Sequence, residues 1–143
     1  MSAVASSDSS GRVDFSRLWW AGPLAIVAAV VVNIIIQQIA AAVLQPDPQF
    51  MPLTIGVVST FTVIGVLGAV LVYALIGRFS QRPIMLFRRV ALIALVVSLI
   101  PDILMAFTGF IPGTTVPNVI VLMIMHVAAW AVAVGVLTRF ARA

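Results

Sequence analysis

The sequence contains no cysteine, no lysine and no glutamate, and charged residues make up only 8% of its 143 residues. Without cysteine the chain forms no disulfides and has no thiolate metal ligands or thiol redox chemistry. A soluble domain has about 25% charged residues, so this chain has too few to cover a surface that faces water. Hydrophobic residues make up 63% of the chain, with a mean hydropathy of +1.24. This composition predicts an integral membrane protein.

Four long apolar segments predict an all-α fold, a transmembrane four-helix bundle. Each segment reaches the roughly 20 residues that a helix needs to cross a bilayer. The predicted helices cover about 20–44, 54–77, 87–110 and 119–137, within a domain of residues 17–143. Residues 1–16 are small and polar and cannot bury apolar area, so we predict a short disordered N-terminal tail there.

The positive charges are all arginines, and their positions predict the orientation of the chain. They lie before the first helix, between the second and third, and after the fourth: Arg12, Arg17, Arg78, Arg82, Arg88, Arg89, Arg139 and Arg142. By the positive-inside rule both termini and the middle loop are cytoplasmic. We interpret Arg78, Arg82, Arg88 and Arg89 as orientation signals that also face lipid headgroups. The net charge of +4 therefore does not indicate nucleic-acid binding.

A few polar residues interrupt the apolar segments at a common depth. Asp102 is the only acidic residue inside a long apolar segment, and His126 is the only histidine. With Asn33, they lie roughly 18–20 Å from the cytoplasmic end of a ~30 Å hydrocarbon core, at 1.5 Å per residue. A carboxylate at this depth needs a partner. The third and fourth helices are joined by a short turn, so we predict that Asp102 and His126 meet in a buried polar layer, with Gln37 and Ser98 nearby.

Small and polar residues recur at about every fourth position, which lets membrane helices approach closely. The predicted packed faces are Ala21, Ala25, Ala29, Asn33, Gln37 and Ala41 on the first helix; Gly56, Thr60, Gly65, Gly68 and Ala69 on the second; Ala94, Ser98, Asp102 and Ala106 on the third; and His126, Ala129 and Ala133 on the fourth. Pro101 removes the hydrogen bond to the carbonyl of Val97, so we predict a kink in the third helix. Ser98 or a water is expected to satisfy that carbonyl.

Three functions fit such a polar layer. We favour a small membrane protein of structural or accessory-subunit type, in which the layer fixes helix packing. The first alternative is proton-linked transport of a small solute or ion by an oligomer, because a buried Asp–His pair titrates as a coupled unit. The second is a subunit that contacts a pigment, haem or quinone in a larger complex, through His126 with Trp130 one turn away.

An enzymatic function is not expected. The sequence has no nucleophile–base–orienter set, no cluster of metal ligands and no phosphate loop. We therefore assign no cofactor, metal or catalytic residue. The expected partners are the lipid bilayer and other membrane subunits or a second copy of the chain.

Four short elements carry a resemblance to a known family. They are Arg-Leu-Trp-Trp-Ala-Gly-Pro at 17–23, Gly-Val-Leu-Gly-Ala at 65–69, Ile-Pro-Asp-Ile-Leu at 100–104 and Met-His-Val-Ala-Ala at 125–129. In this order, over about residues 17–139, the chain resembles an uncharacterised family of small four-helix bacterial membrane proteins. The resemblance implies a four-helix bundle in the bacterial plasma (inner) membrane and implies no activity.

The predicted orientation places the loops after the first and third helices outside the cell. A cysteine introduced at Gln45 or Thr114 should therefore react with an impermeant thiol reagent added to intact cells, because the chain has no other cysteine. A cysteine at Ser80, in the middle loop, serves as the matched control and should react only after the membrane is opened. Labelling of Gln45→Cys or Thr114→Cys from the cytoplasmic side alone would contradict the orientation.

Overall fold

The computed structural model describes residues 11–143, which form four long α-helices and no β-strand. The elements are α1 (Phe15–Leu44), the 3₁₀ turn η1 (Met51–Leu53), α2 (Ile55–Phe79), α3 (Pro83–Thr108) and α4 (Val116–Phe140). All four α-helices are long and apolar enough to cross a membrane. The all-α fold and the multi-pass character predicted from the sequence are therefore confirmed.

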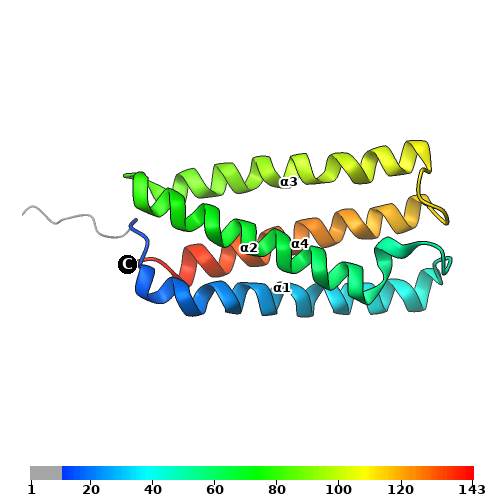
Figure 1. Ribbon diagram of the computed structural model, residues 1–143, viewed down its shortest axis with the longest axis horizontal. Helices are drawn as coiled ribbons and strands as arrows, with labels where there is room; N and C mark the ends of the chain where they lie inside the picture. The colour runs from blue at the N-terminus through cyan, green and yellow to red at the C-terminus, as the bar shows by residue number, and fades with distance from the viewer. Residues whose placement is uncertain (1–10) are drawn as a thin grey trace, which may run out of the picture.

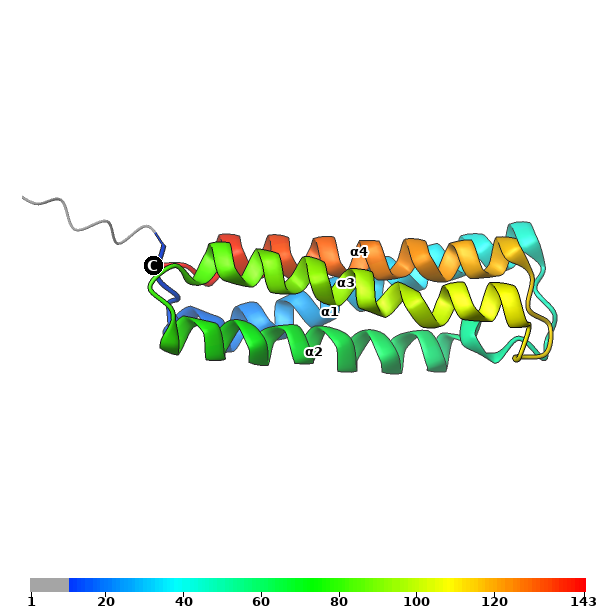
Figure 2. The same ribbon diagram turned by 90° about the horizontal axis from the view of Figure 1, so that it is seen from above.

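The four helices run antiparallel to their sequence neighbours in one elongated bundle (Figure 1). α1 packs along both α2 and α4, and α3 packs along both α2 and α4. α2 and α4 also contact each other, whereas α1 and α3 lie on opposite edges of the bundle (Figures 1 and 2). A side chain on α1 therefore meets α2 or α4, and a side chain on α3 meets the same two helices from the other side.

The helices begin earlier than the sequence predicts at three of the four starts. Asp14 caps α1, because its Oδ1 accepts hydrogen bonds from the backbone N–H groups of Ser16 and Arg17. Thr115 caps α4 in the same way through the N–H of Asn118. Pro83 occupies the first turn of α3, where its missing N–H costs nothing. Capping residues thus set these starts, whereas the predicted starts followed only the apolar runs.

Asp14 is ionised when it caps α1. The hydroxyl of Ser16 donates to its carboxylate, and with the backbone N–H groups of Ser16 and Arg17 it holds the pKa of Asp14 below the ordinary value. α1 thus begins at Phe15, inside the stretch 1–16 predicted as a disordered tail. Residues 1–10 of the predicted tail lie outside the described part of the chain.

The two ends of the chain pair with each other beside the α2–α3 connection. The backbone N–H of Asp14 donates to the carbonyl of Ala141 at 2.9 Å, and that of Ala143 donates to the carbonyl of Arg12 at 2.9 Å. Beneath this pairing, the buried Tyr73 hydroxyl donates to the carbonyl of Ala141 at 3.4 Å. All eight arginines lie at this end of the bundle, which we call the arginine end.

The predicted packed face of α1 is confirmed as far as Gln37, whereas Ala41 is only partly buried, and the predicted face of α2 is wrong except at Gly68 and Ala69, which are partly buried. Ala21, Ala25, Ala29, Asn33 and Gln37 are all buried. On α2, by contrast, Gly56, Thr60 and Gly65 are exposed, and the buried residues are Val58, Thr62, Val66 and Tyr73. Val58, Thr62 and Val66 keep the fourfold spacing on α2, but with larger side chains than the alanines of α1.

Gly77 is the one position on α2 where the fold requires a glycine for space. A Cβ there would lie 2.6 Å from Cγ2 of Val13, which is buried against it. Gly77→Leu should therefore displace Val13 and the chain end that pairs with the C-terminus. We expect it to lower the free energy of unfolding by about 1–3 kcal/mol. Thermal unfolding in detergent measures this loss.

Gly135→Leu is the matched control, because a Cβ at Gly135 meets nothing within 4 Å. Equal melting temperatures for the Gly77→Leu and wild-type proteins would show that Val13 does not pack as described.

Candidate functional site

Asn33 binds across the α1–α2 interface. Its Nδ2 donates to Oγ1 of Thr62 at 2.9 Å, and that hydroxyl donates in turn to the carbonyl of Val58 at 2.7 Å. Asn33 is 3% exposed and Thr62 is 7% exposed, so the bond is shielded from the bilayer. A threonine hydroxyl can accept one bond while it donates another, so the three groups form a continuous chain. This chain joins α1 to α2 at mid-height.

Gln37 lies one turn further along the same face of α1. Its Nε2 donates to the carbonyl of Leu53 at 3.0 Å, at the end of η1. The bond links the connection between α1 and α2 to α1. Leu53 and Phe50 in this connection are also buried, so the connection packs against the bundle. Gln37 therefore satisfies a backbone carbonyl of the loop and does not reach the other polar residues.

Asp102 and His126 meet across the α3–α4 interface, as the sequence predicts. Nδ1 of His126 lies 3.0 Å from Oδ2 of Asp102 and 2.8 Å from the carbonyl oxygen of Leu122. Because a carbonyl can only accept, Nδ1 carries a hydrogen, and the geometry directs that hydrogen to Leu122. Oδ2 of Asp102 therefore has a close neighbour but no hydrogen-bond partner among residues 11–143. Asp102 is 5% exposed, whereas the His126 side chain is 39% exposed.

The predicted single polar layer is therefore two separate groups. Asn33 and Gln37 belong to the interface of α1 with α2 and its preceding loop, and Asp102 and His126 belong to the interface of α3 with α4. Depth along the helices places these residues at one level, but α1 and α3 lie on opposite edges of the bundle. Level alone does not determine which helices become neighbours.

Ser98 and Pro101 do not cooperate as the sequence suggests. The hydroxyl of Ser98 donates to the carbonyl of Leu95 at 2.7 Å, three residues back in its own helix. It therefore does not satisfy the carbonyl of Val97 that Pro101 frees. α3 continues through Pro101 to Thr108, and the predicted kink stays a prediction.

The four arginines around the connection between α2 and α3 lie at one end of the bundle. Arg78 ends α2, Arg82 caps α3, and Arg88 and Arg89 occupy its second turn. All four are exposed. They surround the arginine end and lie far from Asp102 along α3.

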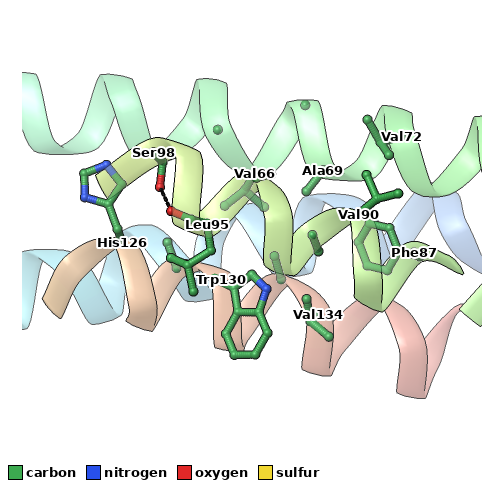
Figure 3. Close-up of a pocket in the computed structure, with 16 residues that line it drawn as sticks. Val66, Ala69, Val72, Phe87, Val90, Leu95, Ser98, His126, Trp130 and Val134 are labelled. Atoms are coloured by element: carbon green, nitrogen blue, oxygen red, sulfur yellow. Dashed lines mark hydrogen bonds between the residues drawn. The ribbon is translucent and has the colours of Figure 1, made fainter. Parts of the chain in front are cut away.

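A cavity of about 380 Å³ lies between α2, α3 and α4, on the arginine side of His126. Its walls are mostly apolar and include Gly65 and Gly68 of α2, Ala91 and Ala94 of α3, and Ala129 and Ala133 of α4. Figure 3 shows His126 and Ser98 at one end of the cavity and Phe87 and Val72 toward the other. Gly65 and Ala94 are exposed, so the mouth of the cavity lies between α2 and α3.

Three features of this region were not found from the sequence. The first is Thr62, the partner of Asn33 across the α1–α2 interface. The cavity arises because α2 presents glycines and α3 presents alanines at the same height, and a single helix pattern does not show that they face each other. The third feature is Trp130, whose indole Nε1 is buried with no hydrogen-bond partner among the described residues.

Metal ligation is not supported by the arrangement of side chains. Within residues 11–143, no group of three or more His, Asp or Glu side chains lies close enough to hold a metal ion. Asp102 and His126 form a pair without a third ligand. The site can therefore exchange hydrogen bonds and protons, and it can line a ligand cavity.

Comparison with known proteins identifies the family. Residues 13–143 match the family of unknown function DUF6069. The chain belongs to this family. No curated protein and no solved structure matches the chain. The resemblance to a family of unknown function is confirmed, and the match covers α1 to α4 together with the paired ends of the chain, so DUF6069 corresponds to the whole bundle.

Proposed function

We propose that this member of DUF6069 is a small multi-pass membrane protein with a structural or accessory-subunit role, and that its polar pairs fix how its helices pack. The observation that carries the proposal is the pairing itself. Asn33 bonds to Thr62 between α1 and α2, and His126 lies beside Asp102 between α3 and α4. Asn33 and His126 each lie against a polar side chain of an adjacent helix, and the two pairs do not converge on a shared reaction centre. The proposed role is not enzymatic.

The proposed setting is the plasma membrane of a bacterium, with both termini in the cytoplasm. The gathering of all eight arginines at one end of the bundle supports this orientation through the positive-inside rule. The proposed partners are the lipid bilayer and other membrane subunits or a second copy of the chain. Large apolar side chains cover the outer faces of all four helices and suit either lipid or a helix of a partner.

A second candidate function is proton-linked transport of a small solute or ion, and one observation favours it. Oδ2 of Asp102 is buried without a hydrogen-bond partner in the described chain, next to a histidine that lines a cavity. Intramembrane carboxylates beside a histidine are common elements of proton relays. Four helices are few for a transporter, so this function would require an oligomer.

The two candidate functions predict different effects of Asp102→Asn on the rate of proton uptake into vesicles. In the packing role, vesicles that contain the wild-type or Asp102→Asn protein take up protons no faster than protein-free vesicles after an imposed pH gradient. The packing role also predicts that Asn33→Leu, which removes the hydrogen bond to Thr62 between α1 and α2, lowers the free energy of unfolding by about 0.6 kcal/mol, the average for an interhelical hydrogen bond in a membrane, and by no more than about 1.7 kcal/mol. A pH-sensitive dye inside the vesicles and unfolding in detergent give the two readouts.

Asp47→Asn is the matched control for the vesicle measurement, because Asp47 is an exposed acid in the loop before α2. Proton uptake by the wild-type protein that Asp102→Asn abolishes and Asp47→Asn retains would replace the packing role with the transport role.

A further inference from the structure

A second cavity lies at the arginine end, where the segment before α1 runs beside the connection between α2 and α3 (Figure 2). Its volume is about 560 Å³. Arg12 lines it from the segment before α1, Arg78 from the last turn of α2, and Ser80 and Gln81 from the connection. Phe15, the first residue of α1, forms an apolar part of the wall. The cavity thus combines two cationic side chains, two neutral polar ones and an apolar wall.

The fold holds Arg12 and Arg78 next to each other. Val13 packs directly on Gly77, because a Cβ at Gly77 would lie 2.6 Å from Cγ2 of Val13. Arg12 and Arg78 are the sequence neighbours of these two residues, so their backbones are adjacent in space. The carbonyl of Arg12 also accepts a hydrogen bond from the N–H of Ala143 at 2.9 Å, which fixes the segment to the C-terminal end. Two positive charges therefore line one cavity at fixed positions.

The nearest acidic side chain does not neutralise these two arginines. Asp14 is the one acidic side chain at this end within residues 11–143. Its Oδ1 accepts from the N–H groups that begin α1, and its Oδ2 lies 3.2 Å from Nε of Arg17. Neither Arg12 nor Arg78 forms an ion pair with another residue of the described chain. Like charges held side by side repel each other, and a bound anion would remove this repulsion.

Ser80 and Gln81 add neutral hydrogen-bond donors to the same cavity. Oγ of Ser80 accepts a hydrogen bond from the N–H of Arg82 at 3.1 Å, and a hydroxyl that accepts one bond still has a hydrogen to donate. The side chain of Gln81 is exposed and carries two further N–H donors. No carboxylate lines the cavity. Such a set of donors suits an anion with several acceptor oxygens, and the planar guanidinium group of arginine matches a phosphate group in particular.

From this arrangement we propose that the cavity binds the phosphate group of an anionic phospholipid. The phosphate lies between Arg12 and Arg78, and the glycerol and acyl chains lie along Phe15, which is 51% exposed. Free phosphate has no apolar part to place against this wall. A zwitterionic lipid would bring a third positive charge to the two arginines, which is unfavourable. This binding goes beyond the packing role of the polar pairs and does not depend on it.

Native mass spectrometry of the full-length protein in a neutral detergent tests the proposal through the affinity for phosphatidylglycerol. One phosphatidylglycerol should bind the wild-type protein in preference to phosphatidylcholine. Arg12→Gln/Arg78→Gln should weaken this binding about 30-fold, because each arginine beside an anionic lipid is worth about fivefold. Arg88→Gln/Arg89→Gln is the matched control, since it removes two exposed arginines that do not line the cavity. It should change the affinity by less than about threefold, because solvent and salt screen charges outside the cavity.

Gln81→Glu tests the same cavity without removing either arginine. Its carboxylate would pair with the arginines in place of the phosphate, so the affinity for phosphatidylglycerol should fall about fivefold or more. Gln49→Glu adds the same charge to an exposed position in the connection between α1 and α2, at the opposite end of the bundle, and should bind as the wild type does. All the substituted side chains are exposed, so circular dichroism should show equal helix content in every variant.

Any of three results would contradict the proposal. An equal loss of affinity in the two double-arginine variants would indicate diffuse attraction to a basic surface. Phosphatidylcholine that binds as tightly as phosphatidylglycerol would indicate a site for acyl chains without recognition of charge. Displacement of phosphatidylglycerol by inorganic phosphate at an equal concentration would indicate a site for a free anion and not for a lipid.

Discussion

Hydrocarbon offers no partner to a polar side chain, and this constraint decides which faces of the four helices meet. Leucine and valine are as well solvated by lipid as by one another, so apolar side chains do not select a neighbour. Close approach at small residues and contacts between polar side chains select the neighbouring helix instead. On α1, three alanines and then Asn33 and Gln37 form one buried face, and this face lies against α4 and α2. Most of the remaining surface of α1 consists of exposed apolar side chains suited to lipid.

The same constraint leaves the bundle with one tightly packed part and one loosely packed part. α1, α2 and α4 pack tightly at the arginine end, around Tyr73, Leu137 and the alanines of α1, all of them buried. α3 contacts this group through Phe87, whose ring packs edge-on against Tyr73 with 4.8 Å between centroids, through Asp102 beside His126 at mid-height, and through the buried Met105. Between Phe87 and Asp102, small residues leave the cavity. The looser position of α3 therefore follows from where its side chains can reach.

Much of this architecture can be predicted from the sequence, because hydropathy and small-residue spacing are local properties. Four helices, the face of α1 and the meeting of Asp102 with His126 follow from apolar runs, fourfold spacing and a short turn between α3 and α4. The partner of Asn33 does not follow, because it depends on which of two antiparallel neighbours approaches that side of α1. The buried face of α2 was mispredicted for a related reason: glycines on α2 were read as contacts, but they line a cavity and face lipid.

The caps and the pairing of the two chain ends were missed because they depend on single polar residues outside the apolar runs. α1 begins at Phe15, five residues before the predicted start at 20, and the N–H of its cap Asp14 pairs with the carbonyl of Ala141, over a hundred residues away in the sequence. No periodic pattern marks such a contact. It becomes visible only when both ends of the chain are placed at the same end of the bundle.

The central claim is that the buried polar residues act as two independent pairs, and a double-mutant cycle tests it most directly. Free energies of unfolding in detergent would be measured for Asn33→Ala, Thr62→Val and Asp102→Asn, alone and in combination. The account predicts a coupling energy of about 0.6 kcal/mol between Asn33 and Thr62, and additivity within about 0.5 kcal/mol between Asn33 and Asp102. Strong coupling between Asn33 and Asp102, with additivity between Asn33 and Thr62, would contradict it and restore a single polar layer.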